Sequence, residues 1–306
     1  MERIQQVGIL GAGAMGAYFA ERFFDTPDFS TVLIARGERL DRLKAKGLVI
    51  NGKPYRIPAI HPDEAVSPVD LMIVALKHHH LEEAVQGLEK LVGGSTTIIS
   101  VMNGLESEEY IGSLYGMDRV LYAISVGIDA VRQGNVITYA NPGKHFFGEA
   151  RNTRLSQRVL RVGEAFEKAG IAHETPEDMI RTLWWKFMIN VGMNQASAVL
   201  RAPYGIFQTS PEARDLMDAL MQEVIALADV MHINLTNRDV EEWYSFLKAL
   251  SPQGKTSMLQ DIEAGRKTEV EIFGGKVVEL GDIHGVQTPV NRTVLRIIRV
   301  REQRAG

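Results

Sequence analysis

Residues 7–16 read VGILGAGAMG, and this stretch, in which an apolar run passes directly into a glycine-rich loop, decides the fold. An apolar run this short is typical of a strand buried on both faces in a parallel sheet. The loop has the spacing GxGxxG and consists of Gly11, Ala12, Gly13, Ala14, Met15 and Gly16. Its three glycines would permit a tight turn, the approach of a pyrophosphate and close packing of the next helix. Because a helical pattern follows, we predict a loop that binds a dinucleotide; a strand-to-helix turn without ligand is the alternative.

Short apolar runs and helical patterns alternate along the first half of the chain. The runs lie at residues 31–35, 71–76 and 97–102, and helical patterns such as 81–91 separate them. This alternation predicts an α/β fold with a doubly wound parallel sheet. Further strands are expected at residues 120–131, 135–140 and 145–148, with a hairpin turn at residues 133–135.

The second half of the chain has a different pattern, which is almost entirely helical. Long helical patterns cover residues 179–200, 211–231, 238–250 and 270–284, and a final one follows Pro289. A polar stretch, HETPED at residues 173–178, precedes the first of these helices. We therefore predict two domains, a nucleotide-binding domain at residues 1–174 and an all-helical domain at residues 175–306.

Composition excludes several classes of function. The chain has 34 basic and 38 acidic residues, so neither nucleic acid nor an anionic membrane is an expected partner. It has no cysteine, which removes disulfides, thiolate metal sites and cysteine nucleophiles. The consecutive side chains of His78, His79 and His80 diverge and form no metal site, so they are expected to begin a partly exposed helix. With no leader pattern and no long apolar run, a cytoplasmic protein is expected.

The end of the apolar run at residues 31–35 indicates which nicotinamide cofactor is bound. NAD-specific sites usually carry an acidic residue there, which binds the ribose hydroxyls. In this chain Arg36 follows the run, and its guanidinium group matches a 2′-phosphate. Arg39 could assist. NADP is therefore predicted, with a solvated surface arginine as the alternative.

Polar residues follow two further runs at the expected ligand-binding edge of the sheet. Lys77 follows the run at residues 71–76, and Asn103 follows the run at residues 97–102. Ligands of open α/β sheets bind beyond the carboxyl ends of the strands, so both side chains are candidates for binding cofactor or substrate. A lysine extended toward solvent and a turn asparagine are the structural alternatives.

The helical half carries the stronger constellation. Lys186, Asn190 and Asn194 are spaced i, i+4 and i+8, which places them on one face of an otherwise apolar helix. Burial of the lysine would lower its pKa toward the range useful for acid–base catalysis. A buried ion pair that joins two helices is the alternative. Ser257 has no Ser-His-Asp context, so nothing supports a hydrolase.

The residues resemble those of the 2-dehydropantoate 2-reductase (ketopantoate reductase) family over essentially the whole chain. The matching segments are GAGAMG, the Leu76-Lys77 and Asn103-Gly104 pairs, NVITYANPG, WKFMINVGMN and TSMLQDIEAGRKTEVE. The resemblance implies an N-terminal Rossmann domain, a helical C-terminal domain, and NADPH-dependent reduction of 2-dehydropantoate to (R)-pantoate on the route to coenzyme A. It also implies that Lys186 donates the proton and that Glu269 orients the substrate or the lysine and approaches the cofactor. Asn190, Asn194 and Ser257 would bind the substrate, Asn103 and Lys77 would bridge substrate and cofactor, and the backbone of Ala130 would contact the cofactor.

Two positions depart from the family pattern and leave the 2-keto acid open. Met102 stands where many relatives have glutamine, and Tyr204 where some place another substrate-binding asparagine. The alternatives are the same chemistry on another 2-keto acid, a β-hydroxyacid dehydrogenase, and a non-catalytic NADP-binding sensor. The last would be expected to lose Lys186 or Glu269, and the chain keeps both. Whether the protein forms a homodimer stays open.

Overall fold

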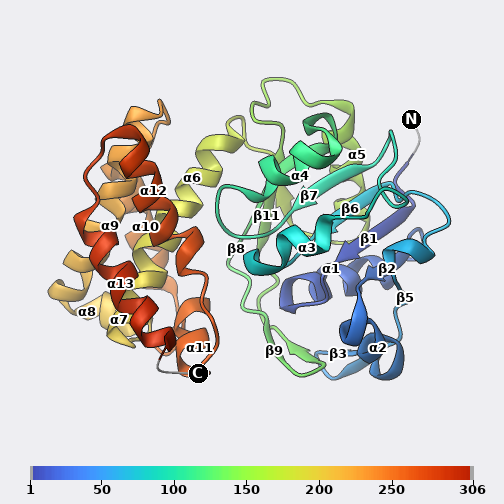
Figure 1. Cartoon of the computed structure of the whole chain (residues 1–306), viewed down its shortest axis with the longest axis horizontal. Coiled ribbons are helices and arrows are strands. Elements are labelled where there is room, and N and C mark those ends of the chain that lie inside the picture. The colour runs from blue at the N-terminus through green and yellow to red at the C-terminus, as the bar shows by residue number, and fades with distance from the viewer. Residues whose placement is uncertain (1–2, 304–306) are drawn as a thin grey trace. The chain divides into compact units, whose positions relative to one another are not determined.

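The computed structural model describes residues 3–303, and the chain divides into two compact units, Met1–Ile180 (unit 1) and Arg181–Gly306 (unit 2) (Figure 1). This division lies six residues beyond the predicted boundary after residue 174 (180 − 174). The intervening segment remains attached to unit 1, because Asn152 N donates to Glu177 O at 2.7 Å and Met179 N to Ala150 O at 3.1 Å.

Unit 1 is built on an eight-stranded sheet with the order β12-β11-β8-β7-β6-β1-β2-β5. The strands are β1 (Gln6–Leu10), β2 (Ser30–Ile34), β5 (Ala59–Ile60), β6 (Leu71–Val74), β7 (Thr97–Ser100), β8 (Val120–Val126), β11 (Lys144–Gly148) and β12 (His173–Glu174). All neighbours are parallel except β8 and β11. The chain winds outward from β1 first to β2 and β5 and then, on the other side, to β6, β7 and β8. This is the doubly wound arrangement that the sequence predicts.

Helices cover both faces of the sheet (Figure 1). They are α1 (Ala14–Phe24), α2 (Gly37–Lys46), α3 (Leu81–Val85), α4 (Ser107–Tyr115) and α5 (Gln157–Lys168), with short 3₁₀ turns η1 (Pro62–Glu64), η2 (His78–His80) and η3 (Met117–Arg119). Successive strand residues enter opposite cores, since Ile73 belongs to the same core as Phe19 and Phe166 while Val74 belongs to that of Leu81. The strands are therefore apolar throughout rather than alternating.

Two predicted elements of unit 1 are shorter than expected. The helical pattern at residues 81–91 forms only α3, because Gln86 has an extended backbone and Gly87 a φ of +72°. The strand predicted over residues 120–131 ends at Val126.

A second, smaller sheet, which the sequence did not predict, lies beside α1. Its order is β4-β3-β10-β9, with β3 (Leu48–Ile50), β4 (Lys53–Tyr55), β9 (Val131–Gln133) and β10 (Val136–Thr138). The predicted hairpin turn is confirmed, because Gln133 pairs with Val136. Two tyrosines attach the sheet to α1: Tyr55 Oη donates to Glu21 Oε1 at 3.0 Å and Tyr139 Oη to Glu21 Oε2 at 2.5 Å.

Over residues 181–303, unit 2 consists of helices and the loops that connect them. Its elements are α6 (Met179–Ile189), η4 (Asn190–Asn194), α7 (Gln195–Leu200), α8 (Tyr204–Thr209), α9 (Pro211–Val230), α10 (Asn237–Ala249), α11 (Ser257–Glu263), η5 (Val270–Ile272), α12 (Gly274–His284) and α13 (Pro289–Gln303). Among residues 3–303, no helix has the length and apolarity needed to cross a membrane.

Two of the predicted helices of unit 2 are interrupted. The pattern over residues 179–200 contains a π-helical turn, η4, between α6 and α7. The pattern over residues 270–284 breaks at Phe273 (φ −108°, ψ −89°), just before Gly274. A Cβ on Gly274 would lie 2.2 Å from Gln195 Oε1, so the break accompanies a close approach to the chain around Gln195.

Candidate active site

The glycine loop has a tight turn, a close contact with the next helix and one open position. Gly11 has a φ of +99°, and a Cβ there would lie 2.6 Å from the carbonyl oxygen of Ala75. A Cβ on Gly16 would lie 1.8 Å from Gly11 O, so α1 packs directly on the end of β1. At Gly13 the nearest atom would be 3.9 Å away. The loop is therefore closed where it meets the sheet and open at Gly13, where a pyrophosphate would approach the N-terminus of α1.

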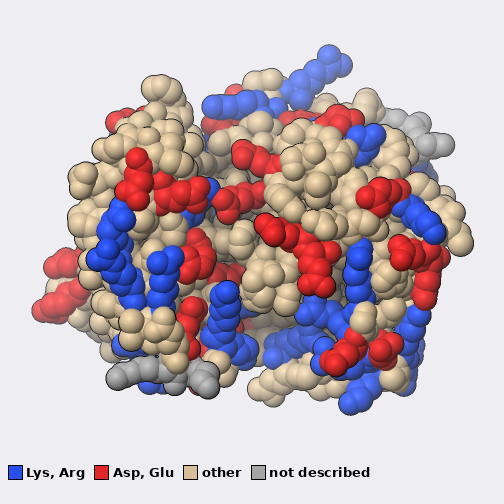
Figure 2. Space-filling model, in the orientation of Figure 1, with Lys and Arg blue, Asp and Glu red and all other residues tan. Residues whose placement is uncertain are grey.

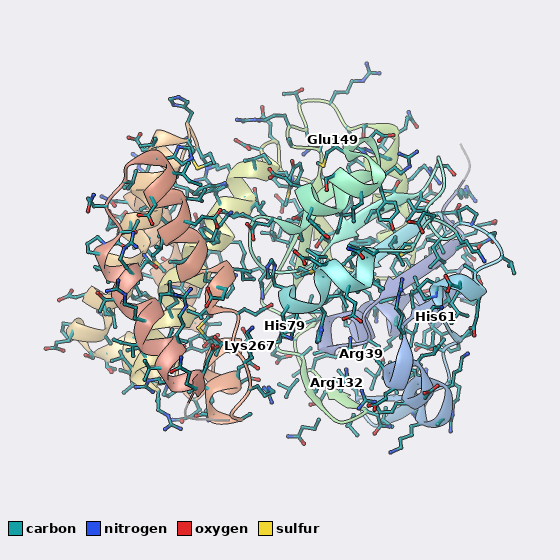
Figure 3. The ribbon with its side chains drawn as sticks, viewed as in Figure 1. Arg39, His61, His79, Arg132, Glu149 and Lys267 are labelled. Atoms are coloured by element: carbon teal, nitrogen blue, oxygen red, sulfur yellow. The ribbon has the colours of Figure 1, made fainter. Side chains whose placement is uncertain are left out.

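A pocket of about 450 Å³ adjoins this loop at the ends of β1, β2 and β6. Its lining includes Gly11 and three arginines, Arg36, Arg39 and Arg42. On the face shown in Figure 2, basic side chains gather over α2 and β9, with a few acidic ones among them. Arg36 donates to the backbone carbonyl of Gln86, which joins the end of β2 to the segment after α3. The pocket beside the glycine loop thus carries three arginines, including Arg39 (Figure 3), and two glutamates, Glu38 and Glu83.

Lys77 and Asn103 occupy equivalent positions beyond two adjacent strands. Val74 of β6 pairs with Ser100 of β7, and each polar residue lies three positions further on (77 − 74 and 103 − 100). Both are partly buried, and so is Ala130 between β8 and β9. His78, His79 and His80 form the partly exposed helix start that the sequence predicts.

A buried polar network, which the sequence does not predict, connects the two ends of the loop that carries Asn103. Ser100 Oγ and Ser107 Oγ are 2.7 Å apart, and Ser107 Oγ donates to Glu108 Oε2 at 2.8 Å. Burial raises the pKa of Glu108 to about 7. The network joins the end of β7 to the start of α4, so it fixes both ends of the loop that carries Asn103. In the sequence, Glu108 looks like an ordinary acidic residue in the first turn of a surface helix.

The stripe of polar residues in unit 2 lies where α6 passes into the π-helical turn. Asn190 and Asn194 are the first and last residues of η4, and Asn194 Nδ2 lies 3.5 Å from its acceptor, Asn190 Oδ1. They are only 7% and 8% exposed. Lys186 is partly buried one turn earlier, and desolvation lowers its pKa to about 8. Such turns are often found at functional sites, and this one holds the two asparagines of the predicted polar cluster.

A second network supports this helix from behind, and its members are far apart in the sequence. Gln195 Nε2 donates to Val191 O within η4 and to Asn291 Oδ1, both at 2.8 Å. Asn291 Nδ2 in turn donates to Glu223 Oε2 at 2.7 Å. Gln195 and Asn291 are fully buried. The only sign of this network in the sequence is that polar residues stand at otherwise apolar helix positions, and they are not among the predicted site residues.

Ser257 and Glu269 lie at the starts of two short helices in unit 2. Ser257 is exposed at the first turn of α11, which packs against η4 and α7. The preceding residue, Thr256, is hydrogen-bonded through Oγ1 to Ser197 Oγ at 2.5 Å. Glu269 is partly buried immediately before η5, and its neighbour Thr268 donates to Glu302 of α13 through both N and Oγ1. The hydrogen bonds of Thr256 and Thr268 therefore fix the backbone next to Ser257 and Glu269.

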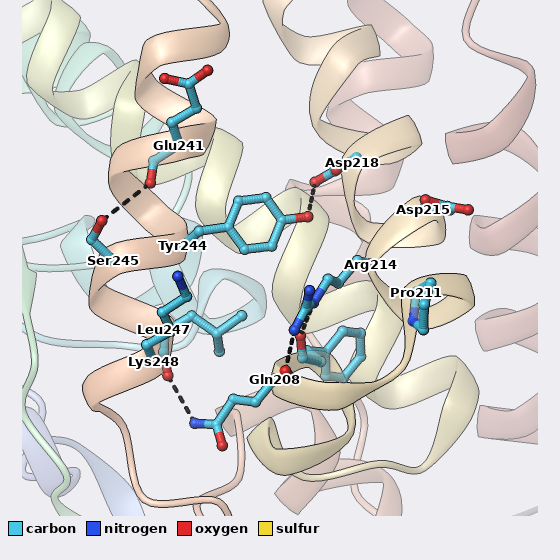
Figure 4. Close-up of a pocket in the computed structure, with 11 residues that line it drawn as sticks. Gln208, Pro211, Arg214, Asp215, Asp218, Glu241, Tyr244, Ser245, Leu247 and Lys248 are labelled. Carbon is cyan, nitrogen blue, oxygen red and sulfur yellow. Dashed lines mark hydrogen bonds between the residues drawn. The ribbon is translucent and has the colours of Figure 1, made fainter.

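A separate pocket of unit 2 contains none of the predicted site residues. It has a volume of about 530 Å³ and lies among α8, α9 and α10 (Figure 4). Its polar groups bind one another, since Tyr244 Oη donates to Asp218 Oδ1 at 2.6 Å and Arg214 Nε to Phe207 O at 2.8 Å. We assign it no part in catalysis.

The doubly wound sheet, its glycine loop and the polar helix define an oxidoreductase with a dinucleotide-binding fold. The chain belongs to the ketopantoate reductase family. The model of Ketopantoate reductase PanE/ApbA matches residues 7–152, and that of the Ketopantoate reductase PanE/ApbA C terminal matches residues 178–302.

Individual relatives agree with this assignment over nearly their full length. The chain is 27% identical over 298 residues to a 2-dehydropantoate 2-reductase of Archaeoglobus fulgidus, covering 97% of this chain and 98% of that protein. The corresponding enzyme of Aquifex aeolicus is 25% identical, with 96% of each chain covered. Among solved structures, a D-mandelate dehydrogenase complex with NADH and anilino(oxo)acetate has a TM-score of 0.89 at 21% identity, covering 98% of this chain and 99% of that one. A ketopantoate reductase of Ralstonia eutropha has a TM-score of 0.86 at 23% identity with the same coverage.

Proposed function

We propose that the protein is an NADPH-dependent ketopantoate reductase, which reduces the C2 ketone of 2-dehydropantoate to the alcohol of (R)-pantoate. The observation that carries this proposal is Lys186, a lysine whose pKa burial lowers to about 8, beside two buried asparagines in a member of this family. Bound NADPH supplies the hydride. The open backbone at Gly13 fits its pyrophosphate, since no atom would lie closer than 3.9 Å to a Cβ there.

The residues of this chain would then divide the work as follows. As hydride reaches C2, negative charge develops on the ketone oxygen, and the Lys186 ammonium stabilises that charge and gives up its proton. Asn190, Asn194 and Ser257 bind the hydroxyl and carboxylate groups of the substrate, and Glu269 orients the substrate or the lysine. Binding of the cofactor falls to the glycine loop and the residues at the sheet edge, namely Arg36, Lys77, Asn103 and Ala130, with Glu269 also near it.

The choice of NADP over NAD rests on the charge of the pocket beside the glycine loop. Arg36 stands two residues after the end of β2, in the region where an NAD-binding site carries an acid, and Arg39 and Arg42 line the same pocket. Glu38 and Glu83 also line it, so the three arginines exceed the acidic residues by one. The D-mandelate dehydrogenase neighbour was solved with NADH, so the fold alone does not decide between the cofactors.

A second candidate substrate is a 2-keto acid with a larger, aromatic side chain. Tyr204 begins α8, and its ring lies against the turn that leads to Ser257, since a Cβ on Gly254 would be 2.8 Å from the ring. Tyr204 replaces the asparagine of some relatives, and the D-mandelate dehydrogenase neighbour points to the same substrate class.

The test is oxidation of NADPH and of NADH by the purified protein with 2-dehydropantoate and a panel of 2-keto acids that includes 2-oxo-2-phenylacetate. We expect the highest kcat/KM with NADPH and 2-dehydropantoate, and (R)-pantoate as the product on chiral chromatography. Turnover of 2-oxo-2-phenylacetate with none of 2-dehydropantoate would overturn the named substrate and keep the reaction class. A staphylococcal ketopantoate reductase of the same fold is described as dimeric, so light scattering of the same sample tests whether a homodimer forms.

A further inference from the structure

We infer that Arg132, on the β9–β10 hairpin, is a specificity-determining residue that binds the 2′-phosphate of NADPH. This inference rests on the proposed function only for the identity of the cofactor. Neither the glycine-loop spacing nor the position after β2 points to a residue so far along the chain.

Arg132 is held against the glycine loop. Its Nη1 donates to the carbonyl oxygen of Ala12 at 2.8 Å, and its Nε donates to Gly134 O at 2.7 Å. Two of its nitrogens are thus fixed by backbone oxygens, while Nη2 forms no hydrogen bond with residues 3–303. The guanidinium group is therefore held in one orientation, with an edge left for a further acceptor.

The hairpin that carries Arg132 is itself attached to the helix that follows the glycine loop. β10 pairs with β3, and Tyr139, just after β10, donates to Glu21 of α1. A rigid connection therefore runs from α1 to the hairpin. An arginine on such a support loses less rotamer freedom on binding a ligand than one on a free loop.

The positive charges around Arg132 favour the binding of an anion. Burial lowers the pKa of Arg132, and the positive charges of Arg39 and Arg42 lower it further. Among residues 3–303, no carboxylate contributes to the pKa shift of Arg132. Because three like charges repel one another, a bound phosphate dianion would relieve the repulsion, and guanidinium groups bind phosphate through paired hydrogen bonds. Arg39 and Arg132 are both labelled in Figure 3.

The neighbours of Arg132 favour the 2′-phosphate over the pyrophosphate. Arg39 and Arg42 belong to α2, which begins directly after β2, and the end of this strand is where the adenosine ribose is recognised. Both line the pocket beside the glycine loop. The pyrophosphate has its own partners at Gly13 and the N-terminus of α1. We therefore assign Arg132 to the phosphate that distinguishes NADPH from NADH.

The test compares the Kd values of the full chain for NADPH and NADH, by nucleotide fluorescence, in Arg132→Gln and Arg132→Lys. For Arg132→Gln we expect about tenfold or greater weakening of NADPH, the range for loss of a charged hydrogen bond, and an unchanged Kd for NADH. Arg132→Lys should retain part of the NADPH affinity because it keeps the charge. Arg56→Gln is the matched control, since Arg56 also donates to a backbone carbonyl, that of Ala45 at 2.7 Å, at the other end of α2.

The outcomes separate this inference from the proposed function. Equal weakening of NADPH and NADH would overturn it, because Arg132 would then serve the pyrophosphate or the shape of the loop. An unchanged ratio of the Kd for NADH to the Kd for NADPH in Arg132→Gln would also overturn the inference, provided that Arg36→Gln lowers this ratio in the same assay. A wild-type protein that prefers NADH would instead contradict the proposed cofactor, whatever Arg132 does. If Arg132→Gln does not fold, the ratio of the two Kd values in Arg132→Lys is the test, and a ratio equal to that of the wild type would overturn the inference.

Discussion

The glycine loop of unit 1 and the polar helix of unit 2 obtain their geometry in opposite ways. The loop is shaped largely by its own backbone, since Gly11 has a φ of +99° and Gly16 is confined by Gly11 O. The polar helix depends on distant side chains, because Asn291 and Glu223 support the π-helical turn through Gln195. Local constraints can be recognised in a sequence, whereas constraints between residues nearly a hundred positions apart cannot. Binding of the pyrophosphate should therefore respond to changes in the backbone of the loop, and turnover to changes in the side chains that support the helix.

The largest expected effect is that of Lys186→Ala. If Lys186 is the proton donor, its loss should lower kcat by about 10²–10⁴-fold, the usual contribution of general acid catalysis. The Kd for NADPH should stay the same, because the glycine loop and its pocket are built from residues of unit 1. Stopped-flow and steady-state measurements with the same preparation check both values. Lys248→Ala, at an exposed lysine of α10, is the control. Activity that survives in the variant would remove Lys186 from the reaction.

The pH profile of the wild-type enzyme should show the same lysine. The pKa of Lys186 is lowered to about 8, so the protonated donor predominates below that pH. The kcat for reduction should be nearly constant on the acidic side and fall about tenfold per pH unit above about 8. The residual activity of Lys186→Ala should lack this inflection. A wild-type profile that stays flat to pH 10 would contradict the assignment.

Alanine at two positions of the glycine loop should separate folding from binding. Gly16→Ala places a Cβ 1.8 Å from Gly11 O, and we expect it to destabilise the fold by about 1–3 kcal/mol or more. Gly13→Ala meets nothing within 3.9 Å and should fold normally, yet weaken NADPH and NADH alike by filling the space of the pyrophosphate. Thermal unfolding and nucleotide titration measure the two effects. Gly94→Ala is the control, since a Cβ there has no neighbour within 4 Å. Unchanged nucleotide binding in Gly13→Ala would contradict the phosphate site.

The features that the sequence predicts correctly are those set by local constraints, and the ones it misses depend on residues far apart in the chain. The doubly wound sheet was predicted because each strand is a continuous apolar run, and the glycine loop because its spacing is local. The helix over residues 179–200 was also expected, but not its π-helical turn, because nothing in its own residues distinguishes it from a regular helix. Glu108 and Glu223 were missed because a buried carboxylate looks like a surface one until its partners are known. The small sheet was missed because β3 and β10 are distant in sequence and only three residues long.

The smallest effect expected, and the sharpest test of long-range support, is that of Gln195→Leu. The change removes the hydrogen bonds of Gln195 to Val191 O and Asn291 Oδ1, and leaves a buried acceptor unpaired. We expect a loss of about 1–3 kcal/mol in stability, and a several-fold lower kcat with an unchanged Kd for NADPH.

Gln222→Leu is the matched control, because Gln222 also donates to an asparagine, Asn237, at 2.9 Å, but at an exposed position of α9. If the Gln195 variant loses stability and keeps its full kcat, the network serves folding alone. The π-helical turn would then be held by its own backbone, as the glycine loop is, and the contrast between the two regions would disappear. If kcat falls while the affinity for the cofactor holds, the side chains behind the helix position Asn190 and Asn194 for the reaction.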